Sequence, residues 1–303
     1  MGDRILQSRS DNTNIKYFGA YKRWECFIKS HGFSALPADS IHISLYLNSL
    51  LNKGSSFAVI SAAVYAIKWA HNMRGLPDPT TNSFVQNLLE ASKRTAKKPV
   101  YKKDSDTNLS NIFSQSDDLL VVRDLAMILH SFSGFLRCNE LSNLHCCDVK
   151  FAEGYFTVVV RKSKTDQYRF GSDIVISKGG TAACPYVMLK RYIHIASINL
   201  ESDSFLFKPV YRSGSVCRFI HKNKPLSYTG AKEAILKRLS LVSESKNFGL
   251  HSLRSGGASI AANNGVNDRC FKRNGRWRSE SSKDGYVADS IERRLKVAQN
   301  LGI

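Results

Sequence analysis

The chain has 303 residues and a formal net charge of +19, from 44 lysines and arginines against 25 acidic residues. Its apolar content of 43% supports buried cores and excludes general disorder, and its length suffices for two domains. A field this positive attracts polyanions, so nucleic acid is favoured over a membrane surface. The sequence contains neither an apolar run near the ~20 residues of a membrane span nor an N-terminal secretion signal. We therefore expect an intracellular protein, nuclear if the host is eukaryotic.

Seven cysteines are scattered along the chain without Cys-x-x-Cys spacing or a histidine-rich neighbourhood. This pattern favours neither a disulfide framework nor a structural zinc, so we expect reduced, mostly buried thiols and no metal or other cofactor. His145, His194 and His221 have no partner at chelating spacing, and we expect them to be structural or solvated. The cysteines are Cys26, Cys138, Cys146, Cys147, Cys184, Cys217 and Cys270.

Residues 13–95 predict a small bundle of amphipathic helices. Apolar side chains recur at helical spacing in four stretches, which capping residues, glycine and proline separate. Such short helices can bury their apolar faces only against one another. The expected helices begin near Asn12 or Thr13, Pro37, Ser55 and Pro79, and the apolar residues expected to face inward include Trp24, Leu47, Ile67, Phe84, Leu88 and Ala91.

The helical pattern dissolves after Lys93 into a basic run around Pro99. Proline and the residue before it disfavour helix, and clustered lysines are typical of solvated segments. We interpret residues 96–113 as a basic linker. It can act as a hinge, as a strap along a nucleic-acid backbone, or as both.

Residues 114–303 predict a second domain of α+β type, so the chain as a whole is expected to be mainly α with a small antiparallel β-sheet. An apolar helix from Leu119 ends at Gly134, and residues 155–160 and 174–176 alternate as a strand hairpin. The later expected elements are a helix over 185–195, a short strand over 205–207, a variable basic loop over 208–224, a helix over 226–241 and an amphipathic tail from residue 289.

The last quarter of the chain contains the strongest motif. His251 and Arg254 are three residues apart, so on a helix both lie on one face and can form a site for an oxyanion. Trp277 follows, then a polar loop, then Tyr286, the only tyrosine after the His-Arg pair. This order in a basic protein resembles the C-terminal signature of the tyrosine recombinases, the phage-integrase-like DNA strand transferases. Tryptophan in place of a second histidine is closest to the Cre-like branch.

A second motif lies upstream, in Gly134-Phe-Leu-Arg-Cys-Asn-Glu-Leu141. By itself an Arg–Glu pair on a helix is usually a surface salt bridge. In this setting Arg137 resembles the first catalytic arginine of the family, and Glu140 would orient Arg137 or His251. The hairpin turn contains a Lys-Ser-Lys-Thr sequence that resembles the family's strand-turn lysine, for which Lys164 is the first choice and Lys162 the second.

The resemblance implies a SAM-like core-binding domain over residues 13–95, joined by the linker to a catalytic domain over residues 114–303. It implies a site-specific recombinase or integrase that works on double-stranded DNA as a dimer on each site and a tetramer in the synapse, with a crypton- or retroelement-type mobile element as one source. The expected reaction passes through a 3′-phosphotyrosine without metal or ATP. Alternatives are a type IB topoisomerase-like enzyme and a domesticated, catalytically inactive DNA-binding protein. The implied catalytic residues are Arg137, Lys164, His251, Arg254, Trp277 and Tyr286, with Glu140 in support.

Overall fold

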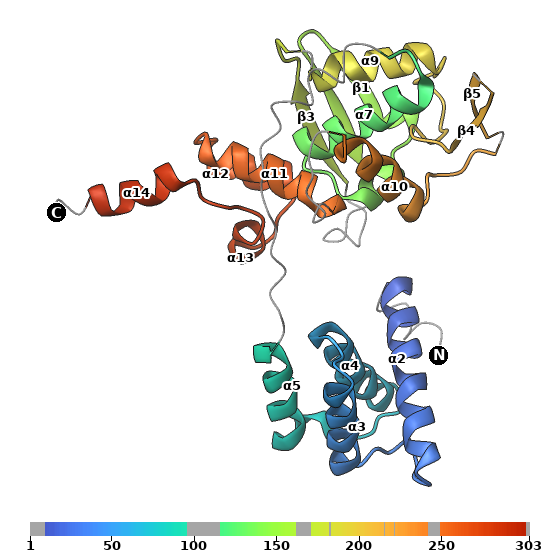
Figure 1. Ribbon diagram of the computed structural model, residues 1–303, viewed down its shortest axis with the longest axis vertical. Coiled ribbons are helices and arrows are strands. Elements are labelled where there is room, and N and C mark those ends of the chain that lie inside the picture. Colours follow the sequence, from blue (N-terminus) through green and yellow to red (C-terminus); the bar gives the residue numbers. More distant parts are fainter. Residues whose placement is uncertain are drawn as a thin grey trace. The chain divides into compact units, whose positions relative to one another are not determined.

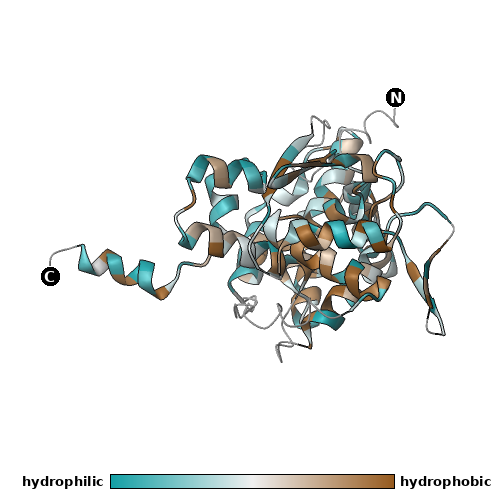
Figure 2. Ribbon diagram, turned by 90° about the horizontal axis from the view of Figure 1, so that it is seen from above, coloured by the Kyte–Doolittle hydropathy of each residue, from teal (hydrophilic) through white to brown (hydrophobic). Residues whose placement is uncertain are grey.

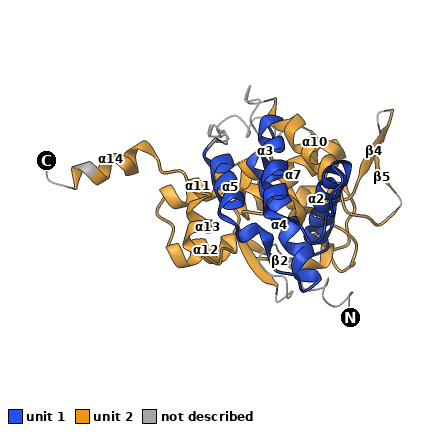
Figure 3. Cartoon of the chain, turned by 90° about the horizontal axis from the view of Figure 1, so that it is seen from below, with its two compact units in different colours: residues 1–99 blue, residues 100–303 orange. Residues whose placement is uncertain are grey.

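The computed structural model describes residues 10–95, 116–161, 171–181, 183–214, 216–220, 222–241 and 249–300. The chain forms two compact units, residues 1–99 and 100–303 (Figure 3). The predicted linker over 96–113 lies outside the described residues, as do Lys162, Lys164 and His221. Within the described ranges, no helix has the length and apolarity needed to cross a membrane.

Unit 1 is a helical bundle, as the periodicity predicts (Figure 1). The Asp39 carboxylate accepts a hydrogen bond from Ile41 N at 2.7 Å and so caps the second of these helices. The Asp78 carboxylate accepts from Thr80 N at 2.9 Å and caps a short 3₁₀ turn. The elements are α2 (Asp11–Ser30), α3 (Ser40–Asn52), α4 (Phe57–Met73), η1 (Pro79–Thr81) and α5 (Ser83–Thr95).

Trp24 lies at the centre of the core of unit 1. Its side chain is fully buried, and its indole Nε1 donates to Ala35 O at 3.1 Å. Its ring packs against the Tyr46 ring at a centroid distance of 5.5 Å. The surrounding core is apolar and comes from all the long helices of the unit: Ile28, Ile43, Leu47, Ile60, Ile67 and Val85.

Two predictions for this unit were wrong in detail. The first helix begins at Asp11, with Ser10 as its N-cap, earlier than expected. On α5, Phe84 is 66% exposed and Ala91 is exposed, whereas Val85 is fully buried. The reason is that the helix does not run on from Pro79: Asn82 Oδ1 accepts from Phe84 N at 2.9 Å, so the helix starts afresh after the 3₁₀ turn and presents a different face.

Unit 2 combines helices with two small antiparallel sheets, which confirms the predicted fold class (Figure 1). The strands are β1 (Val149–Ala152), β2 (Tyr155–Val160) and β3 (Ser172–Ser177), in the order β1-β2-β3, and a separate pair, β4 (Val210–Ser213) and β5 (Val216–Phe219). The helices are α7 (Leu119–Ser133), α8 (Cys138–Ser142), η2 (Cys146–Asp148), α9 (Pro185–Ile195), α10 (Tyr228–Leu239), α11 (Leu250–Asn263), α12 (Asp268–Gly275), α13 (Glu280–Asp284) and α14 (Ile291–Gln299).

Helix α7 is the central element of unit 2, because it packs against α9, α10 and α11. The middle sheet strand shows the expected alternation, with Phe156, Val158 and Val160 buried. Val158 pairs with Val149 on one side and with Ile174 on the other. Helix α7 therefore fixes the position of α11, the helix that carries His251 and Arg254.

Several sequence predictions for unit 2 need correction. Residues 205–207 are not a strand: Phe205 forms only an isolated bridge to His145, while Leu206 and Phe207 are fully buried. Leu206 N donates to Leu144 O at 2.8 Å, so this apolar segment fills the core instead of joining a sheet. The expected basic loop over 208–224 contains the β4–β5 hairpin. Its strands were missed because basic residues interrupt the alternation of apolar residues. Strand β1 was also missed.

The C-terminal part and the cysteines differ from expectation too. The polar stretch before Tyr286, expected as a loop, contains α13, which the Ser279 hydroxyl caps by accepting from Ser282 N. Helix α14 forms as predicted, alternates polar and apolar residues (Figure 2), and leaves Ile291 73% exposed. The thiols are free but not mostly buried. Those of Cys138, Cys146 and Cys184 are buried, those of Cys147 and Cys217 are partly buried, and those of Cys26 and Cys270 are exposed.

Candidate active site

The motif residues His251 and Arg254 lie near the N-terminus of α11, as its second and fifth residues after the N-cap Gly249. Their spacing places them on adjacent positions of the helix surface, as predicted. The two side chains differ in environment: His251 is exposed, whereas Arg254 is fully buried. The helix thus presents an imidazole at the surface of the site and a guanidinium beneath it.

The Arg254 guanidinium is held by backbone carbonyls of two segments distant in sequence. Its Nη1 donates to Phe135 O, and its Nη2 donates to Gly275 O at 2.6 Å. Its Nε is buried and has no acceptor among the described residues. Burial, with the nearby charges of Arg137 and Arg276, lowers the pKa of Arg254 to about 10. A cation kept in such surroundings is a strong binder for an anion that enters the site.

Aromatic rings surround this guanidinium. It lies 4.8 Å from the ring centroid of Trp277 and 4.8 Å from that of Tyr286. The Trp277 and Tyr286 rings are 5.6 Å apart, and Phe271 packs against Trp277 at 4.9 Å. Trp277 is only 5% exposed, and its indole Nε1 is a buried donor without an acceptor in the described part of the chain. Buried donors are nearly always paired, so this one is available to a ligand.

A glycine makes this packing possible. A Cβ added to Gly275 would lie 1.8 Å from the Trp277 ring, far inside contact distance. The Trp277 ring therefore rests directly on the backbone at the end of α12. At the same position, Gly275 O accepts the hydrogen bond from Arg254 Nη2.

The backbone around Tyr286 is fastened to α11 by a row of small polar side chains. Ser255 Oγ donates to Tyr286 O at 2.8 Å, and Ser259 Oγ accepts from Ala288 N at 3.0 Å. One turn further, Asn263 Nδ2 donates to Ala288 O at 3.0 Å. Because Arg254 lies on the same helix, α11 fixes the Tyr286 segment relative to the buried guanidinium.

The upstream motif forms an ion-pair chain beside this cluster. Arg137 Nη1 lies 2.6 Å from Glu140 Oε1, and Glu140 Oε2 accepts from Arg137 N at 2.9 Å and from Arg276 Nη2 at 2.8 Å. Burial alone would raise the pKa of the Glu140 carboxyl, but Arg276 and Arg137 together hold it below its usual value. The predicted Arg137–Glu140 pair therefore exists in the structure, and it contains a further partner.

Arg276 is the residue that the sequence reasoning missed. It is 8% exposed and directly precedes Trp277, a residue of the predicted motif. Its neighbour Arg278 is exposed, and nothing in their spacing distinguishes the two arginines. Burial lowers the pKa of Arg276, although Glu140 acts in the opposite direction.

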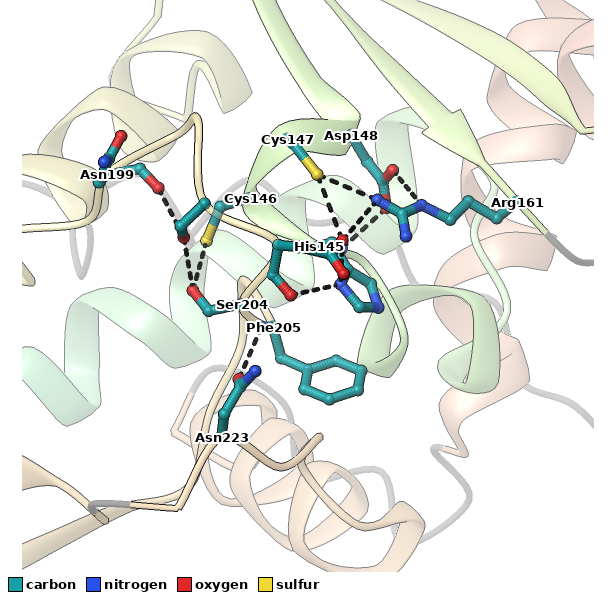
Figure 4. A network of polar contacts seen from close by, with 11 residues as sticks. His145, Cys146, Cys147, Asp148, Arg161, Asn199, Ser204, Phe205 and Asn223 are labelled. Atoms are coloured by element: carbon teal, nitrogen blue, oxygen red, sulfur yellow. Dashed lines mark hydrogen bonds and ion pairs between the residues drawn. The ribbon is translucent and has the colours of Figure 1, made fainter.

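A separate polar network lies at the turn end of the β2–β3 hairpin (Figure 4). Arg161, which follows β2, has its Nε 2.6 Å from Asp148 Oδ1 and its Nη2 3.0 Å from Asp203 Oδ1. His145 joins the network through its Nδ1, 2.8 Å from Asp203 O. The network fixes the residue that leads into segment 162–170, where the predicted lysines lie outside the described residues.

The cluster as a whole suits the binding of a phosphate group. Planar guanidinium groups match pairs of phosphate oxygens, and a desolvated site strengthens each such contact. The phenol of Tyr286 borders the same cationic centre. Within the described ranges, no group of three or more His, Cys, Asp or Glu side chains is arranged to hold a metal ion.

Comparison with known proteins gives concordant matches. Residues 104–293 match the model of the phage integrase family. The chain is 26% identical over 295 residues to an integrase/recombinase xerD homolog of Selenomonas ruminantium, covering 94% of the chain and 83% of the relative. It is 20% identical over 220 residues to the recombinase cre of Escherichia phage P1, covering 70% of the chain and 63% of that relative.

The fold is also similar to that of a solved structure, a lambda integrase tetramer bound to a Holliday junction. The TM-score is 0.58 at 17% sequence identity, and the match covers 95% of this chain and 75% of that one. At such low identity, this match speaks for the fold alone.

Proposed function

The chain belongs to the phage integrase family of tyrosine recombinases, and from this premise we propose that it is a site-specific DNA recombinase acting through a 3′-phosphotyrosine intermediate. The observation that supports this most directly is the buried Arg254 guanidinium, 4.8 Å from the Tyr286 ring. A phenol beside a desolvated cation can attack a phosphate that the cation binds.

In this proposal the cationic side chains stabilise the pentavalent phosphorane. Arg137 and Arg254 hold the non-bridging oxygens, while His251 and the Trp277 indole N–H donate further hydrogen bonds. The buried Trp277 Nε1, for which the described residues offer no acceptor, supports its part in this arrangement. The charge that a metal ion would otherwise neutralise is thereby neutralised by the protein, so the reaction needs no divalent cation.

The Tyr286 oxygen attacks phosphorus and gives up its proton, and the bond from phosphorus to the 5′ oxygen breaks. A phenol has an ordinary pKa of about 10 and is a weak nucleophile at neutral pH, so the cationic cluster must favour the phenolate. Lys164, or Lys162 in its place, protonates the departing 5′ oxygen. A 5′-hydroxyl of a second strand then attacks the phosphotyrosine and releases Tyr286. One phosphodiester replaces another, so ATP is not required.

Double-stranded DNA is the substrate in this proposal, with a dimer on each site and a tetramer in the synapse. The net charge of +19 supports binding to the phosphate backbone. The lambda integrase structure of similar fold is a tetramer on a Holliday junction, and we extend this mode of assembly to the present chain as part of the proposal.

The proposal is tested with nicked suicide duplexes that carry the sequences flanking the gene. Wild-type protein should form a covalent adduct that survives denaturing electrophoresis, both in excess chelator and with magnesium. Tyr286→Phe should form none but should bind the duplex with nearly unchanged affinity, because only the phenol oxygen is removed. Tyr228→Phe is the matched control, since Tyr228 is 62% exposed on α10 and should leave the adduct intact.

Three other outcomes would contradict parts of the proposal. An adduct that persists in Tyr286→Phe would contradict the choice of nucleophile. An adduct lost in chelator and restored by magnesium would contradict the metal-free mechanism. Tight duplex binding without any wild-type adduct would favour the inactive DNA-binding protein.

A further inference from the structure

Arg276 has a backbone conformation that is unusual for a residue with a side chain. Its φ is 55° and its ψ is 39°, in the left-handed region that glycine adopts without strain. Other residues persist there only where the surroundings enforce the conformation, and such strain gathers at functional sites. The tight turn between α12 and Trp277 would accept glycine easily. The side chain of Arg276 therefore needs an explanation of its own.

The Arg276 guanidinium is almost completely enclosed, with 5% of the side chain exposed. Its Nη1 donates to Asn274 O at 2.7 Å and to Gly134 O at 3.3 Å. Its Nη2 donates to Phe135 O at 2.9 Å and to Glu140 Oε2 at 2.8 Å. The side chain thus joins the end of α12 to the α7–α8 connection and to α8 itself.

The carbonyl of Phe135 links Arg276 to Arg254. It accepts hydrogen bonds from both guanidinium groups, and Phe135 is itself left-handed with a φ of 47°. Two non-glycine residues with left-handed backbone conformation, Phe135 and Arg276, are therefore joined by a hydrogen bond at the Phe135 carbonyl. The orientation of the deeply buried Arg254 depends on the same short segment that Arg276 holds.

The charge balance suggests what Arg276 does. Glu140 lies between Arg137 and Arg276, and its side chain is 2% exposed. With Arg276 absent, the carboxylate would pair with Arg137 alone and cancel its charge. With Arg276 present, Arg137, Arg254 and Arg276 against Glu140 leave a formal charge of +2. Arg137, whose side chain is 13% exposed, is then free to use its remaining donors on an anion.

We propose that Arg276 is a positioning residue for DNA cleavage, which balances Glu140 so that Arg137 keeps both its orientation and its charge for the scissile phosphate. This rests on the proposed function. The Arg276 guanidinium donates to Asn274, Gly134, Phe135 and Glu140, so it acts on these groups and is a positioning residue, not one that binds the phosphate. Its effect reaches the reaction through Glu140 and Arg137, and through Phe135 O and Arg254.

The first test measures single-turnover cleavage of the suicide duplex at saturating DNA. Arg276→Gly suits the left-handed backbone, so the turn is retained while the guanidinium is lost. We expect the cleavage rate to fall about 10- to 100-fold, as for other changes that displace a catalytic group, with little change in duplex affinity. Arg278→Gly is the matched control, because Arg278 is exposed two residues further on and loses the same charge.

A double substitution separates charge balance from simple support of the structure. Adding Glu140→Gln to Arg276→Gly removes the uncompensated carboxylate, so the cleavage rate should recover several-fold over Arg276→Gly alone. A purely structural role predicts the opposite, since the double variant has lost more contacts. A double variant as slow as Arg276→Gly or slower would overturn the proposal, and so would an unchanged rate in Arg276→Gly.

A second measurement does not depend on catalysis. The charged groups that face Glu140 are Arg137, Arg254 and Arg276, and they lower the pKa of its carboxyl in the folded protein. The ionised Glu140 therefore stabilises the fold fully at pH values above its unfolded pKa, which is near 4.5. This contribution is lost as the pH falls through the folded pKa. In Arg276→Gly, this loss of stability should occur at a higher pH, as measured by thermal unfolding across the acid range. Glu140→Gln is the reference, because it has no carboxyl at this position and should not show the loss. If the acid transition of Arg276→Gly stayed at the wild-type pH, the inference about Arg276 would be overturned. This result does not depend on adduct formation. A wild-type protein that forms no adduct would instead contradict the proposed function.

Discussion

Two buried tryptophans show how differently the two units use the same side chain. Trp24 is fully buried in unit 1, and its Nε1 donates to Ala35 O at 3.1 Å. Trp277 is 5% exposed in unit 2, yet its Nε1 has no acceptor among the described residues. Aliphatic and aromatic side chains surround Trp24, whereas the Arg254 guanidinium lies 4.8 Å from the Trp277 ring.

The difference shows where stability is given up for binding. A buried donor without a partner costs about 1–3 kcal/mol, and a buried cation costs more unless it is well paired. The core of unit 1 avoids both penalties at Trp24. The cluster at Trp277 accepts them, which is expected of a site whose partner is an anion brought by the substrate.

The largest effect is expected at Trp24. Trp24→Ala should lower the free energy of unfolding of unit 1 by about 3–5 kcal/mol, because it leaves a cavity in a closely packed core. Denaturant unfolding of the full chain, followed by circular dichroism, measures this loss. Trp69→Ala is the control, since Trp69 is only partly buried in the same unit and should cost less. Equal losses for the two variants would contradict the central role of Trp24.

His130 tests whether an unpaired buried nitrogen is enough to mark a site. Its Nδ1 lies 2.6 Å from Ala126 O, its Nε2 has no partner in the described ranges, and apolar rings such as Phe156 pack against it. Burial lowers the pKa of His130 from 6.5 to about 4. We expect a structural role here, because its ring packs against Phe156 and Phe207, and no guanidinium contact to it is found among the described residues.

The sign of its pH dependence follows from that lowered pKa. Between pH 6.5 and about 4 the unfolded chain binds the proton and the folded chain does not, so stability falls as the pH falls. At about 1.4 kcal/mol per pKa unit the loss amounts to about 3 kcal/mol. Urea midpoints measured across this range should show it, and His130→Leu should flatten the slope without changing cleavage at saturating DNA. An equally steep slope in the variant would assign the loss to another group.

The smallest effect in free energy is expected at Trp277. Trp277→Phe keeps an aromatic ring but removes the indole N–H, so cleavage at saturating DNA should slow by about 100-fold, or about 2.7 kcal/mol. The free energy of unfolding should change little, because no hydrogen bond is lost from the described structure. Trp24→Phe is the mirror experiment and should lower stability without slowing cleavage. If both variants affected stability alone, the contrast between the two tryptophans would fail.

Much of the fold could be predicted from local patterns. The helix over 185–195 and the pairing of residues 155–160 with 174–176 match α9 and the β2–β3 hairpin. The predictions failed where local sequence leaves more than one outcome. Phe84 faces outward because a 3₁₀ turn resets the helix start, and residues 205–207 fill the core because Leu144 offers its carbonyl to Leu206 N.

The candidate site divides in the same way. The resemblance to the tyrosine recombinases, which rests on residue order and spacing, selected Arg137, Arg254, Trp277 and Tyr286. The structure places the Arg254 guanidinium against the Trp277 and Tyr286 rings, which also contact each other. The roles of these residues remain predictions. Two features of the site could not be predicted, because both depend on packing between helices. One is the Trp277 Nε1 that finds no acceptor in the described part of the chain, and the other is the row of α11 hydroxyls at Tyr286.

Periodicity, capping and motif spacing are properties of residues within a turn or two of one another, and the sequence alone determined the helices and strands that depend on them. The burial of a charge is different, because it is tolerated only where distant groups supply the compensating contacts. Arg276 contacts Glu140, which lies 136 positions away in the sequence. Its backbone is left-handed, and the residues around it in the sequence do not predict this conformation. Tertiary structure alone decided which arginine of the pair Arg276 and Arg278 would enter the site.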